Sequence, residues 1–496
     1  MEQKVKKVVI AGGGTAGWVA AAMLSGQLGK LLDVTLVESE AIGTVGVGEA
    51  TIPTHKAYHR LLGINEQDFM RATRATFKLG IAFENWGKLG DRYFHSFGSI
   101  GPSTWMTDFQ HMWYQARSEG WAGEMDDYCF ELQAAEAGKF ATSEQSNLNY
   151  AYHLDASLYA QFLRRYSEQK GAKRIEGKIS NVTLAPETGD ISSLQLEDGQ
   201  VIEGDLFIDC TGFRALLIDK ALGVGYEDWS DHLPMNSALA VQTKVSQEIV
   251  PYTRSIARKA GWQWRIPLQH RVGNGHVYCS DFMSDDEAHS ILMDNIEGEL
   301  VSEPRPIRFV TGRRKECWTK NCIALGLSSG FLEPLESTSI HLFQIGVTRL
   351  VQMFPFGGAN DALRNQYNRY AREELESIRD FLILHYKLNQ RTDSDFWKQR
   401  AEMDIPESLQ HRIDLYTKNG IAFQEGLDLF RIDSWLQVFR GQGLESNGYH
   451  LVGQMLPNGQ LKQAMTDLKQ NIVKNVSNMP KHSDFIRQYC GIDNVQ

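Results

Sequence analysis

The sequence has few of the features that mark several large protein classes. Its six cysteines among 496 residues include no C-x-x-C pair and no spacing typical of metal ligands, so we expect reduced thiols and no metal site. No uninterrupted apolar run reaches the ~20 residues of a membrane span. No block of basic residues occurs and the net charge is −10, which argues against a nucleic-acid partner. We therefore expect a cytoplasmic protein that binds neither membrane nor nucleic acid.

The N-terminus imitates a secretory signal, because lysines precede an apolar run. Glycines at positions 12, 13, 14 and 17 interrupt that run, so a strand, a tight turn and a helix explain it better. The pattern predicts a strand at residues 5–11, a helix at 15–26 and a second strand at 34–38, which form one βαβ unit.

The turn of this βαβ unit carries a nucleotide-binding fingerprint. Residues 12–17 fit G-x-G-x-x-G at the start of the helix, where backbone amides bind a pyrophosphate. An acid, Glu38, ends the second strand, where it can bind a ribose hydroxyl. The predicted nucleotide-binding residues are Gly12, Gly14, Thr15, Ala16, Gly17 and Glu38.

Two later segments bear on which dinucleotide is bound. Residues 206–212 (Leu-Phe-Ile-Asp-Cys-Thr-Gly) are similar to a second flavoprotein motif, and residues 321–326 (Asn-Cys-Ile-Ala-Leu-Gly) to the third strand that closes over a flavin ring. Each is also compatible with an ordinary strand-to-glycine turn, but three motifs in this order favour FAD over NAD. Because no second G-x-G-x-x-G provides a nicotinamide site, we expect a separate NAD(P)H-dependent flavin reductase to supply reduced FAD.

The remaining segments predict an α/β fold with a Rossmann-like flavoprotein core of the aromatic-hydroxylase type. Residues 179–184, 191–197 and 201–209 are expected to form an antiparallel meander that returns to a parallel strand, with a turn at Asp198-Gly199. The core should span residues 1–360, with substrate-region insertions at about 61–178 and 226–304, which are too long for loops. Residues 361–496 should form a mostly helical substrate-side part, beginning with an amphipathic helix at 361–386. We expect one compact unit.

Residues 261–267 read Gly-Trp-Gln-Trp-Arg-Ile-Pro. Side chains two apart on an extended segment share a face, so Trp262, Trp264 and Ile266 should form one apolar wall. Packing within a core strand is the plain alternative, since aromatic stripes usually pack.

These segments together resemble the flavin-dependent halogenases of the tryptophan halogenase type. The resemblance rests on the G-W-x-W-x-I-P run, on residues 46–53 (Gly-Val-Gly-Glu-Ala-Thr-Ile-Pro), on residues 77–80 (Phe-Lys-Leu-Gly) and on residues 333–338 (Glu-Pro-Leu-Glu-Ser-Thr). It implies that the tryptophans help to keep organic substrate away from the reactive flavin. It also implies that Ala50, Gly326 and Leu335 contact FAD.

The resemblance makes Lys78 the catalytic lysine, which holds hypohalous acid by hydrogen bonding or carries the halogen as a haloamine. From the residues alone, Phe77, Leu79, Ile81 and Phe83 form an apolar face of a strand whose other face carries Lys78. An exposed lysine on an edge strand would fit that pattern equally.

The resemblance also assigns Glu336 as the catalytic glutamate, which orients the halogenating species or stabilises and deprotonates the attacked ring. Without the motif, Glu336 would be a carboxylate near a helix N-terminus, favoured by the dipole. Glu333 should be structural or surface-facing.

A helix with apolar residues at 340, 343, 347, 350 and 351 follows, and its free amides suit a halide ion. By resemblance, Thr338 and Ser339 bind this halide, chloride or bromide. Halogenases of this type typically have glycine where this chain has Ser339, which leaves the halide preference open.

His95-Ser-Phe97 is similar to the His-x-Phe element whose rings sandwich the substrate indole, although two rings of a small aromatic cluster would read the same way. The acid and aromatic pair that complete a tryptophan clamp have no clear counterpart in residues 425–435. Free tryptophan is therefore not the leading substrate.

These observations predict an FADH2-dependent halogenase that uses oxygen and halide to form hypohalous acid and halogenates an electron-rich aromatic such as an indole. One alternative is an FAD-dependent aromatic hydroxylase, which would give oxygenated product without halide. Another is a non-catalytic flavin-binding protein. A homodimer is possible for this class.

Overall fold

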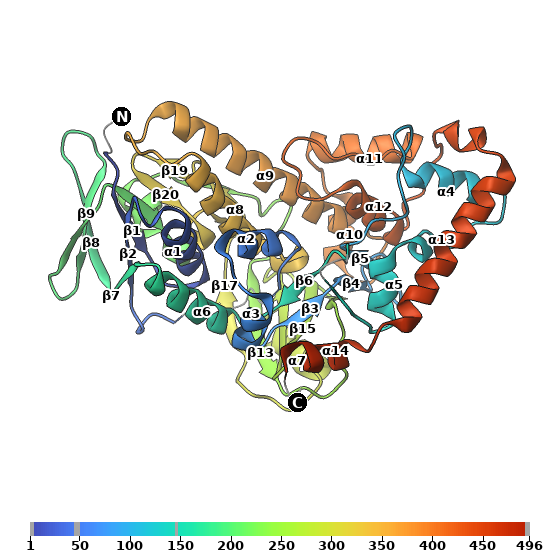
Figure 1. Ribbon diagram of the computed structural model, residues 1–496, viewed down its shortest axis with the longest axis horizontal. Coiled ribbons are helices and arrows are strands. Elements are labelled where there is room, and N and C mark those ends of the chain that lie inside the picture. Colours follow the sequence, from blue (N-terminus) through green and yellow to red (C-terminus); the bar gives the residue numbers. More distant parts are fainter. Residues whose placement is uncertain (1–3, 44–49, 144–146, 492–496) are drawn as a thin grey trace. The chain divides into compact units, whose positions relative to one another are not determined.

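The glycine-interrupted N-terminal run forms strand β1 (Lys7–Ala11), helix α1 (Thr15–Leu28) and strand β2 (Asp33–Glu38), as predicted. Strands β1 and β2 are parallel, with Val8 beside Val34 and Ala11 beside Val37. The computed structural model describes residues 4–43, 50–143 and 147–491 (Figure 1). Residues 46–49 of the Gly-Val-Gly-Glu-Ala-Thr-Ile-Pro motif lie outside the described residues.

A six-stranded sheet surrounds β1 in the order β19-β20-β11-β1-β2-β7. Five of its strands are parallel and β19 is antiparallel at one edge. Helix α1 is apolar on all sides and packs against α6 (Ala156–Gln169) and α8 (Ser339–Gln352). The added strands are β7 (Lys173–Glu176), β11 (Leu206–Asp209), β19 (Trp318–Thr319) and β20 (Cys322–Ala324). This sheet confirms the Rossmann-like α/β core.

The predicted meander consists of β8 (Ile179–Leu184), β9 (Ile191–Leu196) and β10 (Val201–Glu203). We expected one strand over residues 201–209, whereas β10 and β11 are separate. The break lies at Asp205, whose carboxylate accepts the amides of Lys6 and Lys7 at 2.8 and 2.7 Å. This side-chain capping moves the chain from the meander into the parallel sheet.

The chain divides into two units. The first contains Met1–Ala75, Leu154–Ser237 and Pro306–Glu376, and the second contains Thr76–His153, Ala238–Arg305 and Ser377–Gln496. The sequence placed the first insertion at about 61–178, but α3 (Glu66–Thr73) packs on α6, so both helices belong to the first unit. The first unit also contains α2 (Thr54–Leu62) and the small sheet β12 (Tyr226–Asp228), β18 (Gly312–Arg314) and β21 (Gly330–Phe331).

The second unit is built on the neighbouring strands β13-β16-β15-β14-β4-β5. Their bounds are β4 (Gly80–Glu84), β5 (Arg92–Ser96), β13 (Ser237–Thr243), β14 (Thr253–Arg258), β15 (Gly261–Pro267) and β16 (Val272–Tyr278). A separate two-stranded ladder joins β3 (Thr76–Lys78) to β6 (Ala151–His153). Strand β17 (Arg305–Arg308) lies where the chain returns to the first unit.

The C-terminal part is mostly helical, as predicted. Helix α9 (Asp361–Lys387) matches the expected amphipathic helix, and helices α10 to α14 follow it (Figure 1). The remaining helices are α4 (Phe109–Ser118), α5 (Phe130–Glu136), α7 (Asp285–Asn295), α10 (Asp395–Glu402), α11 (Glu407–Asn419), α12 (Ile432–Gly441), α13 (Asn458–Asn478) and α14 (His482–Cys490).

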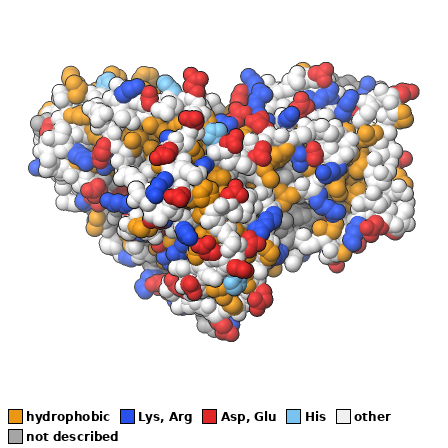
Figure 2. Space-filling model, turned by 180° about the vertical axis from the view of Figure 1, so that it is seen from behind, with side chains coloured by type: hydrophobic (Ala, Val, Ile, Leu, Met, Phe, Trp, Pro, Cys, Tyr) orange, Lys and Arg blue, Asp and Glu red, His pale blue; other side chains and the backbone are white. Residues whose placement is uncertain are grey.

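Acidic and basic side chains are interspersed over the face that Figure 2 draws. Within the described ranges, no helix has the length and apolar character needed to cross a bilayer. Among the same residues, no three His, Cys, Asp or Glu side chains converge as a metal site.

Candidate functional site

The fingerprint turn leaves no room for a side chain at Gly12, Gly13 or Gly17. A Cβ on Gly12, whose φ is +107°, would lie 2.2 Å from the carbonyl oxygen of Cys210, and one on Gly17 would lie 1.9 Å from that of Gly12. A Cβ on Gly14 would meet nothing within 4 Å. Open space therefore lies before the N-terminus of α1, where the amides of its first turn can bind a pyrophosphate.

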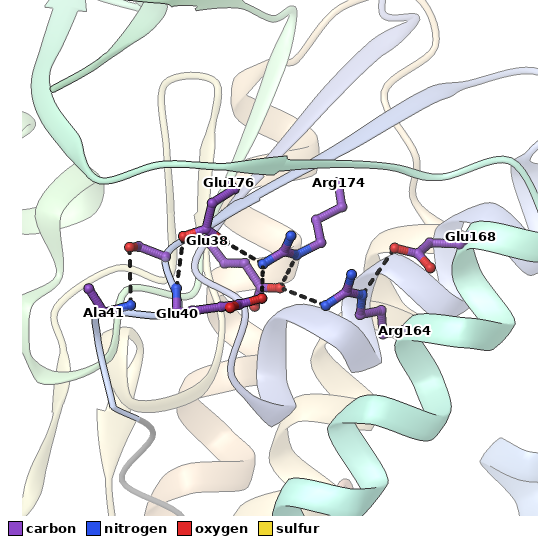
Figure 3. A network of polar contacts seen from close by, with 8 residues as sticks. Glu38, Glu40, Ala41, Arg164, Glu168, Arg174 and Glu176 are labelled. Atoms are coloured by element: carbon purple, nitrogen blue, oxygen red, sulfur yellow. Dashed lines mark hydrogen bonds and ion pairs between the residues drawn. The ribbon is translucent and has the colours of Figure 1, made fainter. Parts of the chain in front are cut away.

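Glu38 ends β2 beside this turn, as predicted. A Cβ on Gly13 would lie 1.5 Å from Glu38 Oε2, while Glu38 Oε1 accepts a hydrogen bond from Arg174 Nε at 2.5 Å. Figure 3 shows Arg174 reaching Glu38, Glu40 and Glu176, with Arg164 on the other side of Glu38. The arginine fixes the carboxylate at the strand end, which is the position that binds a ribose hydroxyl.

Arg174 was not predicted from the sequence. It lies on β7, which pairs with β2 so that Leu36 is beside Arg174 and Glu38 beside Glu176. A basic residue among acids on a neighbouring parallel strand could have indicated this contact only if the pairing of β2 and β7 were known.

Asp209, the acid of the second flavoprotein motif, organises the segment after β11. It is fully buried, and its Oδ1 accepts the amide and hydroxyl of Thr211 at 2.9 and 2.7 Å and the Ser328 hydroxyl at 3.0 Å. Its Oδ2 accepts the amides of Leu217 and Ile218 at 2.8 and 2.9 Å. One side chain thus ties the second motif to the third, a role that the sequence motif alone did not assign.

The third motif packs directly on the first. Gly326 has a φ of +71°, and a Cβ there would lie 2.6 Å from the Ala16 methyl. Gly326 also lines a cavity with Ser339 of the α8 N-terminus. The first unit therefore brings the fingerprint helix, Gly326 and the predicted halide segment into one region, and the open space at Gly14 leaves the amides at the start of α1 open to a phosphate group.

The predicted halide segment forms a sharp turn before α8. Leu335 and Glu336 are buried in a short 3-10 helix (Pro334–Glu336), and Ser337 turns the chain with a φ of +59°. Thr338 is the N-cap of α8, and its side chain makes no capping hydrogen bond. Amides of this turn can therefore bind an anion. Glu333 is also buried, which excludes the surface-facing alternative and leaves the structural one.

A polar chain, buried except at Thr54, contacts the first turn of α8. Thr54 Oγ1 and His341 Nδ1 are 2.9 Å apart, His341 Nε2 is 3.0 Å from Glu374 Oε1, and Arg349 donates to Glu374 Oε2 at 2.7 Å. Although burial opposes ionisation, the hydrogen bonds and charges of His341 and Arg349 hold the pKa of Glu374 below its ordinary value. This support was not predicted from the sequence.

Lys78 is completely buried, so the interpretation as an exposed edge lysine is wrong. It ends β3 opposite Ala151 of β6, and its Nζ lies 5.3 Å from the centroid of the Phe97 ring. The strand that we expected over residues 77–84 is broken at Leu79, whose amide donates to the carbonyl of Pro251 at 2.7 Å. Both faces around Lys78 are buried.

Buried polar groups surround the β3 strand. Thr76 Oγ1 donates to the Pro267 carbonyl at 2.7 Å and lies 3.1 Å from His153 Nδ1, while His153 Nε2 lies 2.9 Å from Thr253 Oγ1. Burial, together with the charge of Lys78, holds the pKa of His153 well below its ordinary value. His153 is therefore neutral beside the lysine strand.

His95 and Phe97 lie at the end of β5 and just after it, both buried. The His95 ring lies 5.4 Å from that of Phe381 and 5.9 Å from that of Phe430. Phe381 and Phe430 stack at 3.8 Å, and Trp435 meets Phe381 edge-on at 4.9 Å. The segment at 425–435 thus supplies aromatic neighbours that sequence comparison with a tryptophan clamp did not identify.

The tryptophan motif forms β15, as the alternation predicted. Trp262, Trp264 and Ile266 are all buried, and the two indoles lie 6.2 Å apart. Trp264 lies beside Gly275 of β16, where a Cβ would be 2.0 Å from the indole ring. The indole thus covers a glycine on the neighbouring strand.

Several known proteins are similar to this chain over most of its length. The sequence pattern of the family described as tryptophan halogenase matches residues 7–458. The tryptophan 6-halogenase SttH of Streptomyces toxytricini is 37% identical, over 88% of this chain and 89% of that protein. The tryptophan 7-halogenase RebH of Lentzea aerocolonigenes is 36% identical, over 85% and 83%. The solved structure of Xcc4156, a flavin-dependent halogenase from Xanthomonas campestris, is 52% identical over 98% of each chain, with a TM-score of 0.96.

Proposed function

The chain belongs to the tryptophan halogenase family and is a flavin-dependent halogenase, and on that basis we propose that Lys78 and Glu336 carry out its halogenation of an electron-rich aromatic such as an indole. The observation that carries the proposal is the complete burial of Lys78. Full burial of a lysine is rare, because removing the ammonium from water is costly, and here it falls on the lysine of the Phe-Lys-Leu-Gly motif. Phe97, 5.3 Å from its Nζ, extends the proposed site to the aromatic cluster of the second unit.

Reduced FAD, when bound, supplies the oxygen chemistry that oxidises a halide to hypohalous acid. In the first unit, the amides of Gly14, Thr15 and Ala16 would hold the pyrophosphate, Glu38 the ribose, and Ala50, Gly326 and Leu335 would border the flavin. Thr338 and Ser339 would bind the halide, and the Thr54–His341–Glu374 chain would keep their helix turn fixed.

Lys78 would receive the oxidant. Its ammonium would donate a hydrogen bond to hypohalous acid, or its neutral amine would take the halogen and release water. An aromatic ring between His95 and Phe97 would then attack the halogen, whose bond to oxygen or to the lysine nitrogen breaks as water or the lysine amine, protonated in the step, leaves. Glu336 would stabilise the ring cation and take its proton. Trp262 and Trp264 would keep the substrate away from the flavin.

The substrate and partners follow from the same residues. Buried aromatic side chains around His95 favour a planar indole or phenol, and we place free tryptophan second because no acid of a tryptophan clamp was identified at 425–435. A separate flavin reductase is the expected electron source. Chloride or bromide, a homodimer and a cytoplasmic location stay predictions.

The test uses the full chain with FAD, a flavin reductase, NADH and either chloride or bromide, against indole, phenol and tryptophan panels. We expect halogen mass shifts that Lys78→Ala reduces by at least about 100-fold, as removal of catalytic groups does. Lys88→Ala, an exposed lysine of the second unit, serves as the matched control.

Unchanged halogenation by Lys78→Ala would refute the role of Lys78. Oxygenated product without halide would support the aromatic hydroxylase instead. Uptake of FAD without any turnover in the presence of reductase would support the non-catalytic binding protein.

A further inference from the structure

The strand that carries Lys78 is held by the last helix of the chain. The amide of Phe77, the residue before Lys78, donates to His482 Nε2 at 3.1 Å. The other ring nitrogen, His482 Nδ1, lies 2.9 Å from the carbonyl of Ile249. Because Nε2 accepts a backbone hydrogen, Nδ1 carries the ring hydrogen and donates it to Ile249. His482 thus links two segments of the second unit.

The tautomer of His482 is fixed by this environment. The side chain is completely buried, and burial, opposed by the hydrogen bond to Ile249, lowers its pKa to about 4. The ring is neutral at neutral pH, which it must be to accept from Phe77. Protonation would place a hydrogen on Nε2 facing the hydrogen of the Phe77 amide.

Aromatic packing places α14 against the same strand. The Phe77 ring stacks on Phe140 at 4.1 Å and lies 5.7 Å from Phe485 and 5.6 Å from Tyr489. Phe485 and Tyr489 are one helical turn apart on α14, so both reach the same side of the helix. Figure 1 shows α14, in dark red, near β3.

The start of α14 is anchored as well. The His482 amide donates to the Gly138 carbonyl at 3.0 Å, and the Phe140 amide donates to the Pro480 carbonyl at 3.3 Å. Lys481 forms an ion pair with Glu248 at 3.2 Å. Backbone contacts therefore fix where the imidazole lies relative to Phe77. Helix α14 follows the end of the family match at residue 458, so the family motifs gave no sign of this contact.

We propose that His482 is a positioning residue for the proposed catalytic Lys78: its neutral imidazole and helix α14 hold the Phe77–Lys78 peptide so that the lysine Nζ captures the oxidant. The inference rests on the proposed function of Lys78. Displacing a reacting group by about 1 Å can cost 100-fold in rate. A displaced Lys78 would leave flavin oxidation unchanged while the oxidant is lost before it reaches the substrate.

The diagnostic quantity is therefore coupling, the halogenated product formed per oxygen consumed. Loss of folded protein lowers product and halogenase-dependent oxygen consumption together and leaves their ratio unchanged, whereas a misplaced lysine lowers the ratio. The experiment uses the full-length protein with FAD, reductase, NADH, bromide and indole. The FAD dissociation constant, from fluorescence titration, shows independently that the first unit is intact.

Three substitutions separate the two hydrogen bonds. In His482→Gln, the side-chain amide lies about as far from the backbone as Nε2 of the histidine and offers both a donor and an acceptor. Coupling should therefore stay within about twofold of the parent. His482→Asn can still reach the Ile249 carbonyl but is too short for Phe77, and His482→Leu removes both bonds. For these two we expect coupling to fall about tenfold with unchanged FAD affinity, as for partial displacement of a reacting group.

A matched control is His276→Leu. His276 is also a fully buried histidine of the second unit with a pKa lowered to about 4, and its Nδ1 lies 3.1 Å from the Ala288 carbonyl. Among the described residues, its side chain makes no hydrogen bond to β3. Its coupling should match the parent. Parent-like coupling in folded His482→Asn and His482→Leu would overturn the positioning role. An equal loss of coupling in His276→Leu and in His482→Leu would also overturn the positioning role.

Lys78→Ala in the same assay distinguishes the two proposals. If Lys78→Ala abolishes product but the His482 variants keep their coupling, only the positioning role fails. If Lys78→Ala itself stays coupled, the proposed function of Lys78 fails, whatever the His482 variants do.

Discussion

Gly14 and Gly17 differ in what surrounds them, although both belong to the nucleotide fingerprint. Gly17 lies against the backbone of Gly12, where a Cβ would clash at 1.9 Å, so this glycine is needed for the fold of the turn. Gly14 faces open space and has a φ of −71°, a value that alanine adopts freely. The need for glycine at Gly14 therefore comes from the ligand.

We predict that Gly14→Ala weakens FAD binding and leaves the fold intact. The free energy of unfolding should change by no more than about 1 kcal/mol, the range for N-cap substitutions. The FAD dissociation constant should rise about tenfold, since the methyl occupies the approach of the pyrophosphate to the amides. Fluorescence titration and urea unfolding measure the two quantities.

Gly459→Ala in α13 is the control, because a Cβ there also meets nothing within 4 Å. It should leave FAD affinity unchanged and, as a glycine replaced within a helix, stabilise the protein slightly. Equal FAD affinity in the parent and Gly14→Ala would show that the pyrophosphate does not lie at this helix end.

At the scale of elements, β15 and β16 fit each other through a large residue opposite a small one. Trp264 lies between Ser255 of β14 and Gly275 of β16, and its indole fills the space above the glycine. Cross-strand pairs of this kind stabilise a sheet through packing. The tryptophan strand thus depends on the composition of both its neighbours.

We predict that Gly275→Ala destabilises the protein by about 1–3 kcal/mol, because the added methyl overpacks against the Trp264 ring. Trp264→Phe should relieve that clash, so the double variant should be less destabilised than the sum of the two single variants. Urea unfolding of the four proteins gives the coupling free energy. Additive effects would mean that Trp264 does not cover Gly275 in solution.

Local patterns predicted several elements well. Strand β1, helix α1 and helix α9 follow from apolar periodicity and glycine placement, which act over a few residues. The burial of Lys78 could not be predicted this way, because its surroundings come from Phe97, Ala151 and His482, far apart in the sequence. The alternation of apolar and other residues over 77–84 predicted one strand. Hydrogen bonds from Leu79 to Pro251 and from Phe97 to Leu79 divide it into two.

The residues of the candidate site also differ in whether the sequence could predict them. Motifs located the glycine turn, Glu38 and the α8 N-terminus, since each motif records a local backbone requirement. Their supports, Arg174, His341 and Glu374, could not be inferred, because nothing in the sequence tells which strand or helix lies beside them. Resemblance named Lys78 and Glu336 without describing their surroundings.

At the scale of the whole molecule, buried histidines make stability depend on pH. Burial lowers the pKa of His55 to about 3 and those of His276 and His482 to about 4, from an unfolded value of about 6.5. Between these values the unfolded chain binds more protons than the folded one, so the free energy of unfolding falls as the pH falls. Asp126 opposes this below about pH 6, where burial raises its pKa.

We therefore predict a loss of stability as the pH is lowered from about 6.5 to 4, with each histidine contributing up to about 1.4 kcal/mol per pH unit. Urea unfolding at a series of pH values measures it. His482→Gln, which has no titrating ring, should reduce the slope by one histidine's share. An unchanged slope would show that His482 is not buried and neutral in the folded protein.

The Asp209 network has a consequence for how the protein handles its flavin. Five hydrogen bonds from Thr211, Leu217, Ile218 and Ser328 satisfy this one carboxylate, and all of them come from the chain itself. Because these hydrogen bonds all come from the chain, the shape of this segment does not depend on a bound ligand. A segment of this kind would keep its shape through repeated binding and release of a flavin, as the proposed supply of FADH2 by a separate reductase requires.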